Sequence, residues 1–391
     1  MYTRKLVSQL TERISEPRRF IQIVIGPRQT GKTTAVTQAL QATETPHHYV
    51  SADDPNIISA IWLQNEWEQA RMLAKKVDCV LVIDEIQKIK NWSAVVKTLW
   101  DEDTRAGVAL RVILTGSSSL LLHEGMEESL MGRFEVLYCP HWNYLECKEA
   151  FSFTLDQFLY FGGYPGAASL ISDETRWVRY MGTSIVEPTI SQDILMMDEV
   201  RKPALLRALF MLGAGYSSQE LSFTKLLGQL QDAGNTVTLS HYLELLGKAN
   251  ILTGLQNYSG TGLKTRKSSP KFMVFDTSLM TYAHGTNRKR LIDNSADRGR
   301  LVESAVGAYL LARGREEDFA VHWWRQRGDE VDFILAKGQE LTAIEVKNGK
   351  TKNLGGSFVF KQKYPKALSL TVGSANLSIE DFLLGKCELF K

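Results

Sequence analysis

Three short runs of aliphatic residues stand out in the first third of the chain. They lie at residues 20–25 (FIQIVI), 80–83 (VLVI) and 110–114 (LRVIL), and each is about as long as one strand. The runs are nearly continuous instead of alternating with polar residues, which is typical of strands buried on both faces of a parallel sheet. Residues 34–40 follow the first run and favour a helix. We therefore expect an α/β fold with a parallel sheet in residues 1–150.

A glycine-containing loop connects the first run to that helix. Its sequence, GPRQTGKT, matches the phosphate-binding pattern G-x-x-x-x-G-K-[ST] at every fixed position, in the strand–loop–helix context that the pattern needs. Glycines let consecutive backbone N–H groups point into one concavity, which attracts phosphate oxygens. Lys32 would place its charge on the β- and γ-phosphates, and the Thr33 hydroxyl would ligate Mg²⁺. The residues expected to bind nucleotide here are Gly26, Pro27, Arg28, Gln29, Thr30, Gly31, Lys32, Thr33 and Thr34.

Two acidic residues follow the second aliphatic run. Asp84 comes directly after residues 80–83, and Glu85 is the next residue. Beside a phosphate-binding loop, the first acid would hold Mg²⁺ through its water shell, and the second would polarise the water that attacks the γ-phosphate. An acidic pair can also simply end a strand, but the distance from the loop favours the functional interpretation. We expect Asp84 to be a metal residue and Glu85 to be catalytic.

Two further positions are candidates for contact with the γ-phosphate, and each has a structural alternative. The third run ends in Thr115, followed by GSS, whose hydroxyls would either sense the γ-phosphate or form an ordinary turn. Arg133 opens the segment RFEVL. It would act as a catalytic arginine finger or as a sensor on the developing charge, or lie at the surface where a strand begins.

The segments GPRQTGKT, VLVIDE, RVILTGSSS and MGRFEVL, in this order and spacing, resemble an AAA+-type ATPase. They are similar in particular to a prokaryotic family of AAA+/STAND-like proteins related to the archaeal-type ATPases. The resemblance implies ATP and Mg²⁺ as cofactors, nucleotide sites between the protomers of a ring or dimer, and a nuclease-like domain at the C-terminal end. It also implies that a G-x-P turn opens a helical lid and approaches the adenine. Gly163, Tyr164 and Pro165 would do so here, unless they are a plain connector.

The middle of the chain changes to helical patterns. Residues 151–202 would form the lid, and residues 203–290 contain three short helical segments followed by two strand-like segments, the pattern of a winged helix. Such a module either contacts DNA, with its third helix in the major groove and its wing on phosphates, or serves only as a lid or interface. The third helix would offer the polar residues Asn235, Thr236, Thr238, Ser240 and His241. The wing would offer the cations Lys264, Arg266, Lys267 and Lys271.

Residues 291–391 contain a second set of acidic residues. Glu303 lies in a helical segment, and Asp332 and Glu345 lie in two strand-like segments, with Lys347 two residues further on. The order E…D…E-x-K resembles the PD-(D/E)XK nucleases, with their restriction-endonuclease-like α/β fold, in which carboxylates converge on Mg²⁺ and the lysine positions the nucleophile. Residues two apart on a strand face the same side, so Glu345 and Lys347 would share one site. The alternatives are three acids that hold no metal, and a nuclease fold kept for DNA binding or architecture without cleavage.

Charge is distributed unevenly along the chain. Its 46 basic and 44 acidic residues nearly cancel, so the 391-residue chain as a whole lacks the basic character of a histone-like binder. Residues 258–300, however, contain nine bases and three acids, and residues 341–366 contain six bases and one acid. Positive charge therefore gathers where DNA phosphates would lie.

Cysteine usage and hydropathy indicate the compartment. The four cysteines form no C-x-x-C pair, which argues against a disulfide scaffold or a zinc ribbon. No apolar run approaches the roughly 20 residues of a membrane-spanning helix. We expect a reduced, cytoplasmic protein without a membrane segment.

These observations predict an ATP-hydrolysing protein that acts on DNA as a motor, loader or remodeller and carries a Mg²⁺-dependent nuclease-like domain at its C-terminal end. The alternative is an ATP-gated switch or scaffold whose C-terminal domain binds DNA or a protein partner without cleavage. The expected organisation is an ATPase core at 1–150, a helical lid at 151–202, a winged helix at 203–290 and the nuclease-like domain at 291–391.

Overall fold

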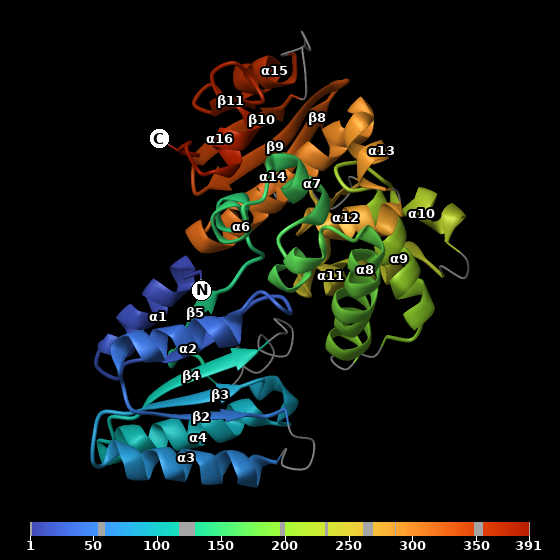
Figure 1. Cartoon of the computed structure of the whole chain (residues 1–391). Helices are drawn as coiled ribbons and strands as arrows, with labels where there is room; N and C mark the ends of the chain where they lie inside the picture. The colour runs from blue at the N-terminus through green and yellow to red at the C-terminus, as the bar shows by residue number, and fades with distance from the viewer. Residues whose placement is uncertain are drawn as a thin grey trace. The chain divides into compact units, whose positions relative to one another are not determined.

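A computed structural model of the chain separates into two compact units, Met1–Pro140 and His141–Lys391. Figure 1 draws the first unit in blue to blue-green and the second in green to red. The structure describes residues 2–53, 59–116, 130–195, 200–230, 234–260, 269–285, 287–347 and 355–390.

The first unit is built on a five-stranded sheet in which every strand pair is parallel. The strand order is β2-β3-β4-β1-β5. The strands are β1 Ile21–Ile25, β2 His47–Ser51, β3 Val80–Asp84, β4 Arg111–Gly116 and β5 Phe134–Tyr138. The three aliphatic runs of the sequence thus form β1, β3 and β4, which confirms the parallel sheet.

Helices cover both faces of this sheet, because successive side chains of a strand point to opposite faces. Val80 and Val82 of β3 pack with buried residues of α1 and α2, whereas Leu81 and Ile83 pack with those of α3 and α4. The result is a three-layer α/β/α unit. The helices are α1 Lys5–Ser15, α2 Lys32–Thr43, α3 Ala60–Ala74 and α4 Trp92–Ala106, with a short 3-10 turn, η1, at Ile86–Lys88.

The strand order brings the candidate chemistry to one edge of the sheet. Because β4 lies between β1 and β3, the segments that follow these three strands meet at their carboxyl ends. The loop of residues 26–31 follows β1, Asp84 ends β3, and Thr115 lies at the end of β4.

The second unit begins with a helical region interrupted by a turn at residues 162–164. Its helices are α6 Tyr144–Phe151, α7 Leu155–Phe161, the 3-10 helix η2 Pro165–Leu170, α8 Glu174–Tyr180, and two π-helical stretches, η3 Met181–Val186 and η4 Thr189–Ile194. The helical character expected for this region is confirmed.

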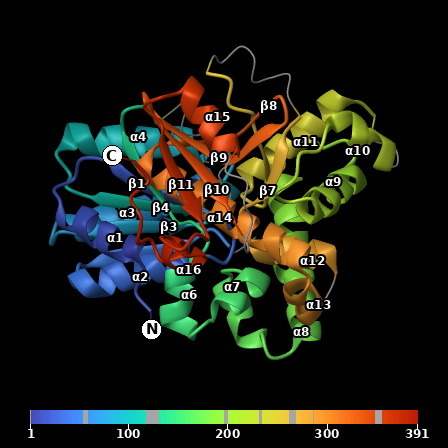
Figure 2. The same ribbon diagram turned by 90° about the horizontal axis from the view of Figure 1, so that it is seen from above.

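Three helices and a two-stranded hairpin follow, in the order that the sequence pattern predicts. Figure 2 shows the yellow helices α9, α10 and α11 grouped together near β7. The helices are α9 Pro203–Gly215, α10 Phe223–Gln229 and α11 Thr236–Lys248, and the antiparallel strands are β6 Leu252–Leu255 and β7 Lys271–Val274. Two further helices, α12 Thr277–His284 and α13 Arg288–Asp293, come next.

The last part of the unit packs a long helix on a mixed sheet of order β11-β10-β9-β8. The pairs β8–β9 and β9–β10 are antiparallel, and β10–β11 is parallel across the intervening α15. The elements are α14 Ser295–Glu317, β8 Ala320–Gln326, β9 Asp329–Lys337, β10 Glu340–Val346, α15 Gly355–Lys363, β11 Leu368–Val372 and α16 Ile379–Leu383. The expected helix around Glu303 and the two strands that hold Asp332 and Glu345 are present as α14, β9 and β10.

All four cysteines are free thiols. Among the described residues, no helix combines the length and the apolar character needed to cross a bilayer.

Candidate nucleotide site and a lysine-centred acidic cluster

The loop after β1 has the backbone shape of a phosphate cradle. Gly31 and Gln29 have positive φ angles of 91° and 58°, so the chain curls sharply before α2 begins at Lys32. Gly26 has no room for a side chain, because a Cβ there would lie 2.1 Å from the carbonyl oxygen of Cys139. The first glycine is therefore required by a close backbone approach, and Gly31 by its left-handed conformation.

Lys32 lies folded into this loop. Its ammonium donates to the carbonyl oxygen of Gly26 at 3.0 Å and to that of Pro27 at 2.7 Å, and only 6% of the residue is exposed. The loop thus holds a cation at the place where it curls, which is the charge that β- and γ-phosphates require.

Asp84 receives hydrogen bonds from residues on four segments. Thr33 Oγ1 donates to its Oδ2 at 3.0 Å and the Tyr49 hydroxyl to the same oxygen at 2.7 Å. Thr115 Oγ1 and the backbone N–H of Glu85 donate to Oδ1. Thr115, expected to sense the γ-phosphate, here orients this carboxylate. Nothing in the sequence pattern points to Tyr49.

Tyr49 is brought to Asp84 only by strand pairing. It lies on β2, which pairs with β3 in a register that sets Tyr49 opposite Val82 and Ser51 opposite Asp84. Burial, together with the hydrogen bond and charge of Asp84, raises the pKa of the Tyr49 phenol, so it remains a donor. No local motif surrounds Tyr49, and its partner is 35 positions away.

The donor set fits a magnesium ion. The Thr33 hydroxyl and the Asp84 carboxylate lie 3.0 Å apart, and both are oxygen ligands of the kind that Mg²⁺ prefers. Mg²⁺ bound there would carry positive charge to the phosphates, while Lys32 would supply a second cation from the loop.

Glu85, which the sequence predicts as the general base, directly follows β3. It has a left-handed backbone (φ 54°), and Gln87 Nε2 donates to its Oε2 at 2.5 Å. Burial raises the pKa of its carboxyl, against the opposing charge of Lys32. A raised pKa makes a carboxylate a stronger base near neutral pH.

Arg133 is placed at the opposite edge of the sheet from the loop of its own chain. Its carbonyl accepts from Ile21 N–H, where β1 begins, whereas the phosphate loop follows the end of β1. Five strand residues span roughly 16 Å. The guanidinium binds Asp101 of α4 at 2.7 and 3.0 Å. The structure thus corrects any role for Arg133 at its own nucleotide loop, and a role toward another protomer stays a prediction.

The roles expected for Pro165 and for the two serines after Gly116 stay predictions. Pro165 is the first residue of η2 in the second unit, and its approach to adenine stays a prediction. Ser117 and Ser118, which follow Thr115, lie outside the described residues.

The predicted reading helix α11 exposes part of its polar set. Thr236, Ser240 and His241 are exposed. Asn235 instead caps the helix, with its side-chain oxygen accepting from the N–H and hydroxyl of Thr238 at 2.9 and 3.2 Å. DNA contact by this helix stays a prediction.

Lys271 is not a solvent-facing wing cation, and the structure corrects that expectation. It opens β7, is 2% exposed, and its ammonium lies 2.5 Å from Glu303, 3.3 Å from Glu330 and 3.8 Å from Asp332. We call these four residues the Lys271 cluster. The other expected wing cations, Lys264, Arg266 and Lys267, lie outside the described residues.

Glu345 and Lys347 form an ion pair of their own. Lys347 Nζ lies 2.9 Å from Glu345 Oε2, on the shared side that strand alternation predicts. The other oxygen of Glu345 accepts from Ser357 N–H at 2.8 Å, and Asp332 Oδ2 accepts from Val346 N–H at 2.7 Å. Among the described residues, no group of three or more His, Cys, Asp or Glu side chains is arranged to hold a metal ion. Of the acids expected to hold Mg²⁺, Glu303 and Asp332 thus face the ammonium of Lys271, and Glu345 lies beside Lys347 as predicted. Metal binding by this set stays a prediction.

Burial and neighbouring charges shift the pKa values of Lys271, Glu303 and Asp332 in opposite directions. Burial works to lower the pKa of Lys271, but the charges of Glu303, Asp332 and Glu330 outweigh it and raise that pKa. Burial raises the pKa of Glu303 to about 7 and also raises that of Asp332, with Lys271 acting in the opposite direction. Lys271 is therefore the resident counter-ion of these acids.

Three family models match successive parts of the chain. Residues 18–148 match the AAA domain family. Residues 152–290 match a domain of unknown function (DUF8612), and residues 298–385 match another (DUF4143). The chain is also similar over most of its length to uncharacterized proteins. A Methanocaldococcus jannaschii protein is 24% identical (83% of this chain, 74% of the relative), one from Haemophilus influenzae 23% (84% and 82%), and one from Mycobacterium tuberculosis 26% (86% and 72%).

The match and the geometry agree for the first unit. The AAA match covers the loop, Asp84 and Glu85, and the parallel sheet places them at one edge. The N-terminal part of this chain is thus supported as a domain of the P-loop ATPase type.

Proposed function

We propose that the first unit binds and hydrolyses ATP with Mg²⁺. The observation that carries this proposal is the meeting of Thr33 and Asp84, 3.0 Å apart, beside the buried ammonium of Lys32. Catalysis of phosphoryl transfer is mostly positioning and charge stabilisation, and these residues provide both.

Each residue has a defined task in this mechanism. The Lys32 ammonium turns from the carbonyl oxygens of Gly26 and Pro27 to the phosphates. It thereby exchanges two neutral acceptors for charged ones. Thr33 and Asp84 hold the Mg²⁺ that offsets phosphate charge. Glu85 orients a water toward the γ-phosphate and accepts its proton.

The test separates binding from turnover. Lys32→Ala should lose ATP binding, whereas Glu85→Gln should bind ATP yet hydrolyse it at least about a hundredfold more slowly, as expected for loss of a general base. Binding is measured with a fluorescent ATP analogue, and turnover by phosphate release. Hydrolysis by Glu85→Gln at the wild-type rate would contradict the assignment.

We further propose that the chain uses ATP to act on DNA, as a motor, loader or remodeller. Support comes from the three helices and hairpin of residues 200–290 and from the excess of bases in residues 258–300 and 341–366. Because Lys271 is turned inward, the remaining cations of these segments would have to make the phosphate contacts.

The Lys271 cluster favours a second candidate for the C-terminal part. In a metal-dependent nuclease the carboxylates must be able to hold the ion, but here Glu303 and Asp332 face the ammonium of Lys271. This arrangement favours an ATP-gated switch or scaffold that binds DNA or a protein partner without cleavage.

One assay separates the two candidates. The protein is incubated with branched, double-stranded and single-stranded DNA, Mg²⁺ or Mn²⁺, and ATP, beside Lys32→Ala, Asp332→Ala and the control Asp329→Ala on the same strand. Cleavage lost only in Asp332→Ala supports the nuclease. DNA-stimulated ATPase without cleavage supports the switch, and no DNA binding at low salt contradicts the DNA partner altogether.

A further inference from the structure

Residues 139–142 carry the chain from the first unit into the second. We call these four residues the strap. Its first half is bonded to the nucleotide loop, and its second half is bonded to the turn that contains Gly163 and Tyr164. The contacts on each side lie within one unit, and the covalent chain joins them.

Arg4 fastens the first half of the strap to the loop. Its Nη1 donates to the carbonyl oxygens of Thr30 at 3.0 Å and Pro140 at 3.1 Å, and lies 3.2 Å from Cys139 Sγ. Arg4 is 6% exposed. A buried guanidinium that bridges two backbone carbonyls holds their separation, because moving either one strands a charged donor.

The loop itself is in direct contact with Cys139. Thr30 is fully buried, and its hydroxyl has two carbonyl oxygens within reach, that of Pro27 at 3.0 Å and that of Cys139 at 3.4 Å. Pro27 also accepts from Lys32 at 2.7 Å. The Thr30 hydroxyl has one proton to donate, so the carbonyl oxygens of Pro27 and Cys139 compete for it. Movement of the Lys32 ammonium away from Pro27 changes how strongly the Pro27 carbonyl competes.

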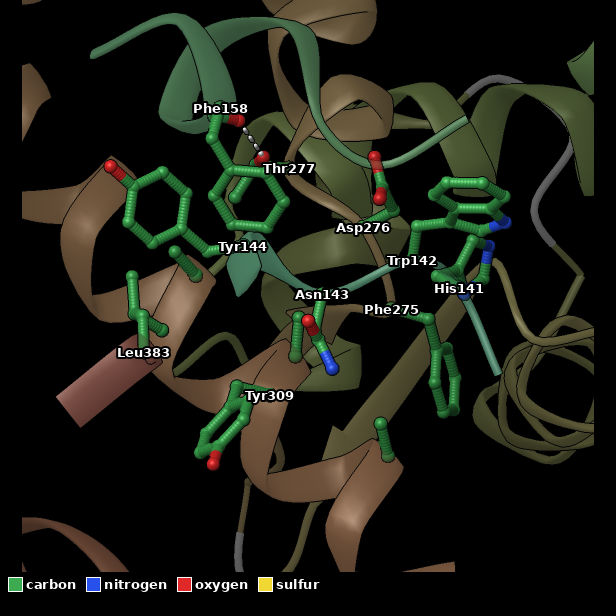
Figure 3. Close-up of a pocket in the computed structure, with 13 residues that line it drawn as sticks. His141, Trp142, Asn143, Tyr144, Phe158, Phe275, Asp276, Thr277, Tyr309 and Leu383 are labelled. Atoms are coloured by element: carbon green, nitrogen blue, oxygen red, sulfur yellow. Dashed lines mark hydrogen bonds between the residues drawn. The ribbon is translucent and has the colours of Figure 1, made fainter. Parts of the chain in front are cut away.

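The second half of the strap is equally well held. His141 Nε2 lies 2.9 Å from the Tyr164 hydroxyl, and Trp142 N–H donates to Gly163 O at 3.3 Å. Gly163 N–H in turn donates to the buried Asp276 at 2.7 Å. Figure 3 shows His141, Trp142 and Asp276 around one pocket of this unit.

We propose that Arg4 is a positioning residue of the nucleotide site and that, through the strap, it couples the loop to the turn at Gly163. Binding of ATP draws Lys32 off Pro27, which shifts the Thr30 hydroxyl and the Cys139 carbonyl. Because Arg4 ties Thr30 to Pro140, the shift reaches His141 and Trp142 and changes their bonds to Tyr164 and Gly163. The inference rests on ATP binding by the first unit.

Hydrogen exchange of the wild type and of Arg4→Met, with and without a non-hydrolysable ATP analogue and Mg²⁺, tests this coupling. In the wild type we expect the analogue to change exchange in peptides covering 139–142 and 160–165. Arg4→Met should bind the analogue about tenfold more weakly, the loss expected for one charged hydrogen-bonding group. At saturation, its peptide 160–165 should no longer respond.

Three further variants sharpen the test. Lys5→Met, at the exposed neighbouring cation, should respond as the wild type does. Arg4→Lys should restore part of the response. Thr30→Val interrupts the same series of hydrogen bonds without removing a charge, and it replaces Arg4→Met in the test if that variant does not fold. An unchanged response of 160–165 in Arg4→Met or Thr30→Val overturns the coupling, as does a wild type that binds the analogue without responding there. No binding by the wild type overturns the proposed function as well.

Discussion

Single carboxylates in this protein are controlled by the number and kind of their donors. Asp84 accepts from Thr33, Tyr49, Thr115 and the backbone of Glu85. A carboxylate with several donors keeps one orientation, which is what a metal-directing acid needs. Tyr49 matters here because it shares an oxygen of Asp84 with the Thr33 hydroxyl.

Removing the Tyr49 hydroxyl tests this orientation. In Tyr49→Phe we expect kcat/KM for Mg²⁺-ATP to fall about three- to tenfold, since one hydrogen bond contributes about 1 kcal/mol. The effect should be partly recovered at high Mg²⁺ concentration. Tyr258→Phe, in the second unit, serves as the control, and equal activity of wild type and Tyr49→Phe at all Mg²⁺ concentrations would refute the role.

Glu303 makes stability depend on pH. Its pKa is raised from 4.5 to about 7, so its favourable contribution is complete below pH 4.5 and is lost as the pH rises through 7. The free energy of unfolding of the wild type should therefore decline over this range, by up to about 3 kcal/mol for a shift of this size. Glu303→Gln should flatten the decline in chemical-denaturation curves recorded from pH 4.5 to 8. Identical slopes for the two proteins would refute the prediction.

At the scale of elements, β7 inserts a cation among acids of the C-terminal sheet and helix. Lys271 comes from the hairpin, Glu303 from α14, and Glu330 and Asp332 from β9. Arg325 of β8 extends the network, because it forms ion pairs with both Glu330 and Glu220. The backbone of Glu220 in turn forms an isolated β-bridge with that of Lys271. The strand β7 is thus joined to α14 and β9 by ion pairs that share Lys271.

Removing the central cation should destabilise the second unit strongly. Lys271→Met leaves three acids without their shared partner, and breaking a buried ion pair costs about 3–5 kcal/mol. The loss should be larger at pH 8 than at pH 5, because the acids can be protonated at the lower pH. Thermal melts at both pH values provide the measurement, with Lys347→Met as the control. An equal loss in the two variants would show that Lys271 has no special place.

At the scale of the whole molecule, the open question is whether Arg133 serves a neighbouring protomer. Within its own chain it binds Asp101, at the edge of the sheet opposite the loop. Only a second copy of the chain can therefore bring it to a nucleotide, and we expect a ring or dimer that ATP stabilises.

Two measurements test this assembly. Light scattering with and without an ATP analogue should show a larger mass with nucleotide, and a monomer at every protein and nucleotide concentration would refute it. Arg133→Ala should lose most ATPase activity, whereas Asp101→Asn, which breaks the same ion pair, should keep it. Equal effects of both variants would show that the pair is structural.

The sequence by itself determined the parts whose cause is local. A run of β-branched residues, a glycine loop and a following helix specify β1, the phosphate loop and α2, because torsion preferences and side-chain period act over a few residues. In the same way, the sequence placed Asp84 and Glu85 at the end of β3 and located several helices and strands of the second unit.

Only the tertiary structure decided which distant residues complete these sites. Tyr49 reaches Asp84 through strand pairing, Arg4 reaches Thr30 and Pro140 across the fold, and Lys271 turns inward although its neighbours in sequence suggest a basic wing. These contacts span 26 to 136 positions within the first unit alone. They depend on how sheets and helices pack, and a charge count along the chain carries no information about which side chains become buried together.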